Sequence, residues 1–399
     1  MTTCLTRPFG RSGLKMPVLS CGGMRFQQTW DRIGADQIEG DSQKNVEACI
    51  RRALELGIRH IETARGYGSS EVQLGKVLQN FKREDYILQT KVAPTADPDK
   101  FTADTEESFA RLGVERVDLF ALHGLNTPEL IEMALRPGGC LDRALKLKKE
   151  GRVRFVGFST HARKSLVLRA IGEGDFDYVN LHWNYIMQDN TPCLKAARAK
   201  DMGVFIISPS DKGGMLQKPP EKFSALTQPF HPMVFNDAFI LMNPDVHTIS
   251  VGAARPGEFD EHMKVMELLS STDGETRIRA IAERLDAEAV RVLGSDFRGD
   301  FLLSLPRWNE VPGQVNLRMT LRLWGLAKAF DMVEFGKFRF NLLGNGGDWF
   351  LGKKPDADNL SAALGAVADH PQRKEIETML KEAMALFAGE DTKRLVKEE

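Results

Sequence analysis

Polar and ionisable side chains recur along the chain at the ends of short apolar runs. Eight of them lie at the end of a short apolar run or just beyond it: Glu62, Tyr67, Lys91, His123, Ser159, Asn180, Ser208 and Arg255. One such residue alone carries little weight, because the ends of strands are normally polar. Together they offer a carboxylate, a phenol, an amine and an imidazole, which are the groups that move protons in enzymes.

The phenol of Tyr67 is a poor acid at neutral pH, since its ordinary pKa is about 10. An adjacent ammonium favours the ionised form of a phenol, so we expect Lys91 to lower the pKa of Tyr67. Glu62 would fix the position of that ammonium, and His123 would orient a substrate oxygen or relay a proton. Reduction of a carbonyl also needs a hydride, which no side chain supplies, so the set implies a nicotinamide cofactor.

Each residue also has a structural interpretation. Tyr67 and His123 could be ordinary residues at the rim of a barrel, while Ser159, Asn180 and Ser208 could satisfy loop backbones. Lys91 is harder to explain in this way, because a buried lysine is costly without a partner.

The elements that would position these residues alternate regularly between about residues 15 and 270. The predicted strands are Val18–Cys21, Ile58–Glu62, Tyr86–Lys91, Val117–His123, Val153–Ser159, Tyr178–Leu181, Val204–Ser208 and His247–Val251. Several of these runs are continuously apolar, as expected for parallel strands that are covered on both faces. Eight βα rounds predict an α/β fold, the (β/α)8 TIM barrel, in which catalytic groups gather at the carboxyl ends of the strands. A doubly wound open sheet more often has an early glycine-rich turn, which is missing here.

Helical periodicity accounts for the segments between the strands and for the rest of the chain. Lys44–Leu56 has apolar residues at helical spacing, and Gly57 is placed to end that helix. Beyond Asp273 the pattern is helical over Glu275–Leu293, Leu317–Phe330 and Glu375–Phe387. We therefore predict a barrel over residues 1–272 and a helical C-terminal domain over 273–399.

Bulk properties exclude several classes of function. A net charge of −1 gives no attraction to nucleic acid or to an anionic membrane, and we expect neither as a partner. No apolar stretch approaches membrane-spanning length, and the N-terminus has no signal-peptide run, which favours a cytoplasmic protein. The five cysteines are scattered without a CxxC spacing, so we expect reduced thiols and no metal site. Nothing indicates the oligomeric state.

At these residues the chain resembles the aldo-keto reductase family. The matching stretches are LGIRHIETARGYGSSEVQLGKVL, ILQTKV, VDLFALH, GRVRFVGFSTH, YVNLHWNYI and GAARPGEFDEHM, which span about residues 8–270 in the family's order. The resemblance implies that the chain interconverts a carbonyl and an alcohol with NADP(H), and that NAD(H) is the alternative cofactor. It places Tyr67 on the proton donor, Lys91 on the lysine that lowers the donor's pKa, and His123 on the family's histidine.

The resemblance also implies the cofactor-binding positions. Ser159 and Asn180 fall where the family holds the nicotinamide carboxamide, although Asn180 replaces a more usual glutamine. The positions that fall in the phosphate and adenosine segments are Ser208, Gly252, Arg255, Glu261 and His262.

Three residues depart from the family's pattern. Glu62 stands in place of an aspartate, and its additional methylene moves the carboxylate unless the side chain folds back to reach Lys91. Glu258 stands near the site of the 2′-phosphate, where many relatives carry arginine or glutamine. Ile207 replaces an aromatic residue that often stacks on the nicotinamide.

The C-terminal stretch resembles the tail of a reductase branch that carries ferredoxin-like iron–sulfur clusters. The places of the cluster cysteines hold Leu302, Leu305, Trp308, Val311, Ala363, Ala366 and His370. An iron–sulfur cluster needs several thiolates, so we predict a degenerate domain without a cluster and with these apolar residues in its core.

The sequence thus predicts an NADP(H)-dependent oxidoreductase of the alcohol dehydrogenase or carbonyl reductase type. Its partner would be a small carbonyl or alcohol substrate, which the sequence does not identify. The alternative is a catalytically weakened nicotinamide-binding barrel with a regulatory or scaffold role, in which Glu62 marks lost catalysis.

Overall fold

The structure is a computed structural model that describes residues 3–392, apart from the side chain of Arg298. The chain divides into two compact units. The first contains the residues up to 213 together with 233–278, and the second contains 214–232 together with the residues from 279 onward. The division at 278 lies near the predicted boundary at 272. No pattern in the sequence marks 214–232 as part of the second unit.

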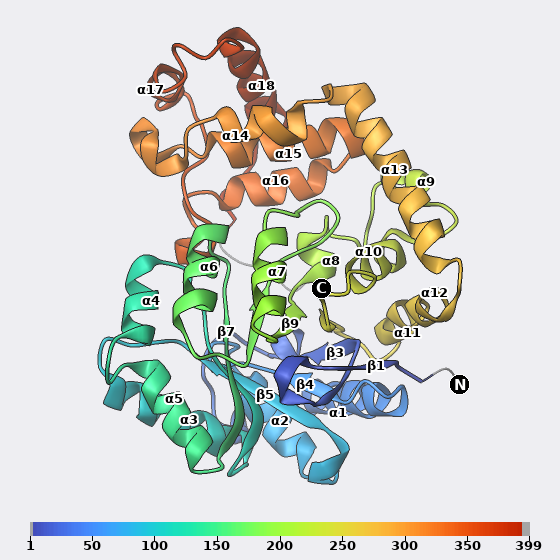
Figure 1. Cartoon of the computed structure of the whole chain (residues 1–399), viewed down its shortest axis with the longest axis vertical. Helices are drawn as coiled ribbons and strands as arrows, with labels where there is room; N and C mark the ends of the chain where they lie inside the picture. Colours follow the sequence, from blue (N-terminus) through green and yellow to red (C-terminus); the bar gives the residue numbers. More distant parts are fainter. Residues whose placement is uncertain (1–2, 393–399) are drawn as a thin grey trace. The chain divides into compact units, whose positions relative to one another are not determined.

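Eight parallel strands of the first unit close into a barrel (Figure 1). They are β3 (Leu19–Gly22), β4 (His60–Glu62), β5 (Ile87–Val92), β6 (Val117–Leu122), β7 (Val153–Ser159), β8 (Tyr178–Leu181), β9 (Gly203–Ile206) and β10 (Thr248–Val251). Neighbours in sequence are neighbours in the barrel, and β10 closes it against β3. The predicted (β/α)8 class is confirmed. Every residue of β6 and β8 is buried, which explains why these strands are apolar apart from Asp118 and Asn180.

One predicted strand is too long for a specific reason. Val204–Ser208 was expected to be extended, but β9 ends at Ile206. Ser208 has a φ of +51°, and the short helix α8 (Pro209–Lys212) begins immediately after it. The turn therefore starts before the end of the apolar run, and it places Ser208 at the barrel mouth.

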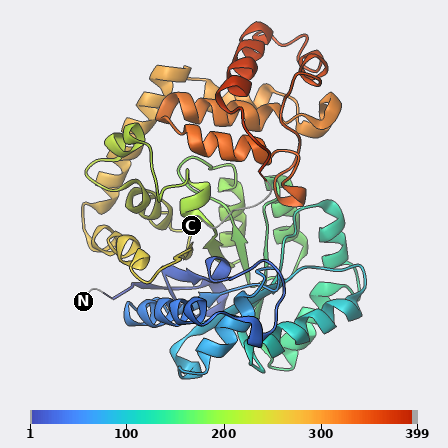
Figure 2. The same ribbon diagram turned by 180° about the vertical axis from the view of Figure 1, so that it is seen from behind.

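Helices cover the outside of the barrel. They are α1 (Gly40–Glu55), α2 (Ser70–Leu78), α3 (Pro98–Leu112), α4 (Pro128–Leu135), α5 (Cys140–Lys149), α6 (Lys164–Glu173), α7 (Thr191–Ala199), α10 (Pro232–Leu241), α11 (Glu258–Met263) and α12 (Val265–Ser270). Seen from behind, α1 lies outside the blue strands (Figure 2). Its predicted end is confirmed: Gly57 has a φ of +81°, and the amide of Ile58 donates to the carbonyl of Ala53 at 2.8 Å.

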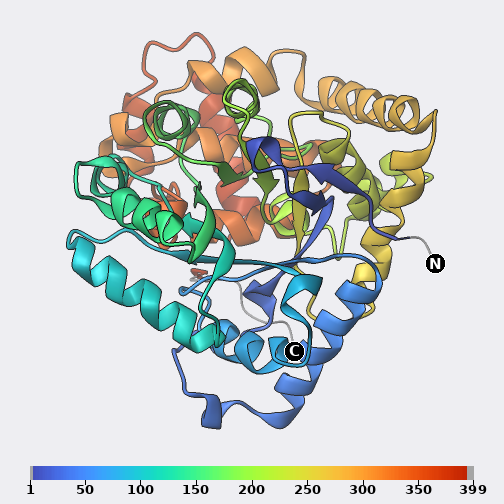
Figure 3. The same cartoon turned by 60° about the horizontal axis from the view of Figure 1, so that its bottom comes forward.

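An N-terminal hairpin that the sequence did not suggest covers the amino-terminal end of the barrel. Its strands are β1 (Thr6–Pro8) and β2 (Lys15–Pro17), which pair antiparallel. Phe9 and Met16 pack there against Tyr178 and Phe205 from the barrel interior. Figure 3 shows this dark blue hairpin against the end of the barrel. The opposite end, where the strands finish, is left for the polar residues.

The second unit is helical. Its helices are α9 (Glu221–Thr227), the later part of α13 (Gly274–Leu293), α14 (Leu302–Ser304), α15 (Leu317–Phe330), α16 (Val333–Leu342), α17 (Leu360–Gly365) and α18 (Arg373–Leu386). α15 packs against α16 and α18. Within the described residues of this unit the only β pairing is the isolated bridge between Val315 and Lys353.

Most of the positions that were compared with cluster cysteines lie in the core of this unit. Leu302, Leu305, Val311 and Ala363 belong to one buried apolar cluster, and Ala366 packs against it. Trp308 is half-buried. His370 accepts a hydrogen bond at Nδ1 from the amide of Gln372 at 3.1 Å, and its Nε2 lies 2.8 Å from the hydroxyl of Ser304. Side chains thus fill this space.

Two further observations concern the chain as a whole. Across residues 3–392 no helix combines the length and the apolar character that crossing a membrane requires. All five cysteines are free and buried.

The hairpin leads to a prediction about stability. Phe9 is fully buried, so Phe9→Ala should lower the free energy of unfolding by roughly 3–5 kcal/mol through the cavity that it leaves. Leu5→Ala is the matched control, because Leu5 is 39% exposed and should change stability little. Urea unfolding followed by circular dichroism measures both. A loss no larger for Phe9→Ala than for Leu5→Ala would contradict the packing role of Phe9.

Candidate active site

The predicted catalytic residues meet at the carboxyl ends of three neighbouring strands. Glu62 is the last residue of β4, Lys91 lies near the end of β5, and His123 directly follows β6. Tyr67 lies in the loop between β4 and α2. The strands pair in sequence order, β4 with β5 and β5 with β6, so the barrel brings these four residues together.

Lys91 and Glu62 form a buried ion pair. Their side chains are 1% and 4% exposed, and the Lys91 ammonium donates to Oε2 of Glu62. The same ammonium donates to the carbonyl oxygen of Thr63 at 2.7 Å, and the Ser250 hydroxyl donates to Oε1 of Glu62 at 3.0 Å. Glu62 therefore reaches Lys91, despite the additional methylene of its side chain. A buried pair persists only when its remaining hydrogen-bonding capacity is also used, and Thr63 and Ser250 use part of it.

Tyr67 and His123 lie next to this pair. The ammonium nitrogen of Lys91 is 4.9 Å from the centroid of the Tyr67 ring. The rings of Tyr67 and His123 lie edge to face, with 5.7 Å between their centroids and an angle of 87° between their planes. Both side chains are half-buried, so they border the open side of the site.

The electrostatics of Tyr67 differ from our prediction. Burial raises the pKa of Tyr67 well above its ordinary value, and the Glu62 carboxylate raises it further. The predicted lowering of this pKa by Lys91 is therefore wrong for this structure. The physical reason is that the Lys91 charge is already paired with Glu62, so the phenol faces a nearly neutral pair. Tyr67 is held as a neutral hydroxyl.

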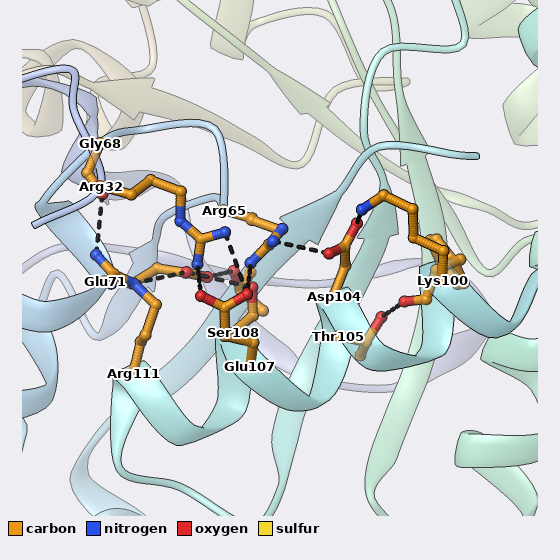
Figure 4. A network of polar contacts seen from close by, with 12 residues as sticks. Arg32, Arg65, Gly68, Glu71, Lys100, Asp104, Thr105, Glu107, Ser108 and Arg111 are labelled. Carbon is orange, nitrogen blue, oxygen red and sulfur yellow. Dashed lines mark hydrogen bonds and ion pairs between the residues drawn. The ribbon is translucent and has the colours of Figure 1, made fainter. Parts of the chain in front are cut away.

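The loop that carries Tyr67 is fixed from outside the barrel by charges that the sequence prediction missed. Arg65 pairs with Asp104 at 2.7 Å and with Glu107 at 2.8 Å, both on α3 (Figure 4). Gly68 has a φ of +54°, and a Cβ atom there would lie 2.0 Å from the carbonyl oxygen of Thr29. An arginine in a polar loop is common, so the sequence contains no signal for this role.

A second part of the same network lies behind the loop. Glu71 of α2 is buried and accepts hydrogen bonds from Thr90 at 2.7 Å and from Ser108 at 3.2 Å. Arg32 pairs with Glu107 at 2.7 Å, and Arg111 donates to the carbonyl oxygen of Gly68 at 3.4 Å. Figure 4 shows the arginines converging on α3 and on the Tyr67 loop. The loop is thus tied to α3 by the ion pairs of Arg65 and by the hydrogen bond from Arg111.

Ser159 and Asn180 lie side by side, and they fit a nicotinamide carboxamide. Their strands pair with these two residues opposite one another. Asn180 is 0% exposed, and among the described residues neither atom of its amide has a hydrogen-bond partner. The Ser159 hydroxyl accepts from the amide of Gly124 at 3.1 Å. A buried primary amide without partners is unusual, and a carboxamide could both accept from it and donate to it.

Three residues of the predicted phosphate segments also lie beyond strand ends. Ser208 follows β9, while Gly252 and Arg255 follow β10, and Gly252 and Arg255 are exposed. A Cβ at Gly252 would lie 3.4 Å from the side chain of Arg25, so a second guanidinium-bearing residue borders this position. The Glu258 carboxylate accepts a hydrogen bond from the amide of Ala254 at 2.9 Å, which gives it a structural role in the loop.

The last two predicted cofactor residues have other partners. Glu261 of α11 forms an ion pair at 2.5 Å with Lys264, which directly follows that helix. His262 is buried, and its Nδ1 lies 2.5 Å from Oδ2 of Asp237 on α10. This buried contact accounts for His262 without a ligand, and neither residue is among those that gather around Tyr67.

A family comparison matches the N-terminal part of the chain. Residues 18–229, slightly more than half of the chain, match the model of the family described as the aldo/keto reductase family. A D-threo-aldose 1-dehydrogenase from a Pseudomonas species is 24% identical over 245 residues, which cover 53% of this chain and 71% of that protein.

Solved structures share the fold. An aldo-keto reductase from Bacillus halodurans, in its holo form, has a TM-score of 0.56 at 18% identity and covers 70% of this chain and 96% of its own. The aldose reductase from Schistosoma japonicum has a TM-score of 0.52 at 20% identity, with 69% and 91% of the two chains covered. At these identities the likeness shows the fold alone.

The raised pKa of Tyr67 predicts how stability depends on pH. The neutral phenol is favoured in the native state, so its contribution is complete below the unfolded pKa of about 10 and is lost as pH rises through the native value. Above about pH 10, the wild type should therefore lose up to about 1.4 kcal/mol of unfolding free energy per pH unit relative to Tyr67→Phe.

Urea unfolding of both proteins between pH 8 and about pH 11 measures this difference. A phenolate absorbance in the wild type that is missing from Tyr67→Phe and appears below pH 10 would show instead that Lys91 controls the phenol.

Proposed function

The chain belongs to the aldo/keto reductase family, and we propose that it reversibly reduces the carbonyl group of a small aldehyde or ketone with NADP(H). The observation that carries this proposal is the meeting of Tyr67, His123 and the Lys91–Glu62 pair at one mouth of the barrel. A proton donor, an imidazole and a fixed buried charge there match what carbonyl reduction needs from the protein.

A bound dinucleotide would supply the hydride. Ser159 and Asn180 would hold its carboxamide, since the buried Asn180 amide could both donate a hydrogen bond to a carboxamide and accept one from it. Tyr67 would donate the proton of its hydroxyl to the carbonyl oxygen, and His123 would orient that oxygen from the neighbouring strand. The raised pKa of Tyr67 supports the donor role, because the hydroxyl stays protonated throughout the physiological range.

Lys91 and Glu62 would act on Tyr67 through their charges and through the position of the ammonium. The ammonium lies against the Tyr67 ring, where it would stabilise the phenolate that remains after proton transfer. Glu62 holds the ammonium in place and balances its charge while the phenol is neutral. The ammonium would therefore offset part of the cost that burial and the Glu62 carboxylate impose on the phenolate.

NADP(H) is the cofactor that the charges favour. Arg255 is exposed after β10, and Arg25 borders Gly252 in the same region. Both could pair with a 2′-phosphate. The Glu258 carboxylate, which would repel that phosphate, is engaged with the amide of Ala254. NAD(H) remains the alternative cofactor.

The second candidate is a weakened barrel that binds the dinucleotide in a regulatory or scaffold role. This candidate depends mainly on Glu62 failing to replace the aspartate that the family carries at this position. The Glu62–Lys91 contact supports the enzyme over this candidate.

For the second unit we propose a helical domain without an iron–sulfur cluster. Apolar side chains fill most of the compared positions, and none of the five cysteines lies beyond residue 193. Elemental analysis of the purified, colourless protein should find far less than one iron per chain. Stoichiometric iron with the visible absorbance of a cluster would contradict this account.

The central prediction concerns the Tyr67 hydroxyl. Tyr67→Phe should lower kcat for carbonyl reduction by about 100-fold to 10,000-fold, because it removes the proton donor. The affinity for NADPH should stay nearly unchanged. The assay follows NADPH absorbance with a panel of aldehydes and ketones.

Tyr86→Phe is the control for this prediction. Tyr86 directly precedes β5, at the opposite end of the strand that carries Lys91, so the variant should keep wild-type turnover. Undiminished turnover in Tyr67→Phe would remove the mechanism. NADPH binding without turnover of any panel member by the wild type would favour the regulatory barrel.

A further inference from the structure

Three basic side chains that the proposed reaction does not use form a cluster at the barrel mouth. The ammonium of Lys212 lies 2.6 Å from Nδ1 of His161 and 2.8 Å from Nε2 of His182. Those two imidazole nitrogens lie 2.8 Å from each other, and the ring centroids are 4.5 Å apart. Three nitrogen atoms thus form a triangle with sides below 3 Å.

The cluster is held by contacts of its own. Nδ1 of His182 lies 2.9 Å from the carbonyl oxygen of Ile207, and the backbone amide of His161 donates to Oδ1 of Asn126 at 2.7 Å. Lys212 ends α8, and its backbone amide donates to the carbonyl oxygen of Ser208 at 3.0 Å. The three residues therefore have defined positions from three consecutive strand ends.

Its place relative to the proposed active site follows from the strands. His161 comes two residues after Ser159, and His182 comes two residues after Asn180, which is paired with Ser159. Two residues of extended chain advance by about 7 Å. The cluster thus lies about one side-chain layer farther out than the proposed carboxamide site, on the β7–β8 side of the mouth. His161 and Lys212 are half-exposed there, so a ligand can reach them.

The hydrogen bonds define the charge that the cluster can carry. A lysine ammonium only donates, so the two imidazole nitrogens that face Lys212 accept from it. His182 then carries its own proton on Nδ1 and donates it to the carbonyl oxygen of Ile207. Each of these two nitrogens has one lone pair, which accepts from Lys212; an additional proton on one of them would form an N–H···N bond with the other and release the Lys212 ammonium to donate to a ligand. The cluster has one positive charge from Lys212 and a place for a second.

We propose that this cluster binds an oxyanion, the carboxylate or phosphate group of the substrate, at the end remote from the reacting carbonyl. This inference rests on the proposed function and narrows its substrate class to oxoacids and related anionic carbonyl compounds. An oxyanion would accept charge-assisted hydrogen bonds from Lys212 and from a protonated imidazole, and its charge would stabilise that second proton.

The same arrangement is unsuited to a metal ion. The Lys212 ammonium contacts both imidazole nitrogens that would serve as ligands, so it would repel a cation from them. Among residues 3–392, no group of three histidine, cysteine, aspartate or glutamate side chains is arranged to hold a metal. An anion is therefore the ligand whose charge matches the cluster.

The test compares two aldehydes that differ only in the remote group, 4-carboxybenzaldehyde and 4-methylbenzaldehyde. Lys212→Met should lower kcat/KM for the carboxylate by roughly 10-fold to 100-fold, the loss of one charge-assisted hydrogen bond. It should change kcat/KM for the methyl compound less than 2-fold. Lys212→Arg should restore part of the difference, because it keeps the charge.

Two further variants complete the design. His161→Gln should also lower the preference for the carboxylate, and it keeps the proposal testable if Lys212→Met fails to fold. Lys195→Met removes an exposed lysine of α7 and should leave both substrates unaffected. Equal losses for both aldehydes in Lys212→Met, with weaker NADPH binding, would assign the cluster to the dinucleotide phosphates and overturn the proposal.

A binding measurement separates this proposal from the proposed function. Calorimetry with 4-methylbenzoate and 4-methylbenzamide needs no turnover. Wild type should bind the benzoate more tightly than the benzamide, and Lys212→Met should lose that difference. Loss of the difference in a protein that reduces no aldehyde would overturn the reductase but keep the anion site. Equal binding of both compounds by the wild type would overturn the anion site even if the reductase is active.

Discussion

The ion pair between Lys91 and Glu62 is the constraint on which the rest of the site depends. Two opposite charges lie almost fully out of water, and each would be very costly there alone. The barrel makes the pair possible, since β4 and β5 are adjacent and parallel: Glu62 is opposite Gln89, and Lys91 lies two residues farther along β5 on the same face of the strand. Thr63 and Ser250 then take up hydrogen-bonding capacity that water would otherwise satisfy.

The pair also sets the state of the phenol beside it. A lone ammonium would pull Tyr67 toward its ionised form, but an ammonium already joined to a carboxylate leaves burial as the larger influence. Tyr67 is consequently ready to give a proton rather than to take one. Its loop is held by the ion pairs of Arg65 with α3, so the position of the hydroxyl depends on charges outside the barrel as well as inside it.

The two ends of the barrel have different roles. At the amino-terminal end, Phe9 and Met16 close the interior with apolar contacts. At the carboxyl end, polar side chains from successive strands remain grouped and partly accessible, with Tyr67 and His123 on one side and His161 and Lys212 farther around. Apolar packing thus closes one end of the barrel, and the candidate site lies at the other, where barrels of this architecture carry their active sites.

The sequence by itself predicted the fold class, because uninterrupted apolar runs that alternate with helical periodicities are local patterns typical of a covered parallel sheet, and eight such rounds favour the closed barrel. It also predicted that Glu62, Lys91, His123 and Tyr67 lie together, since polar residues at strand ends can be read from their order alone. Only the tertiary structure decided the pKa of Tyr67, the partner of His262, the role of Arg65, and the meeting of His161, His182 and Lys212. Each of these depends on which side chains that are distant in the sequence lie within a few ångströms of each other in the fold, and the sequence pattern does not contain these distances.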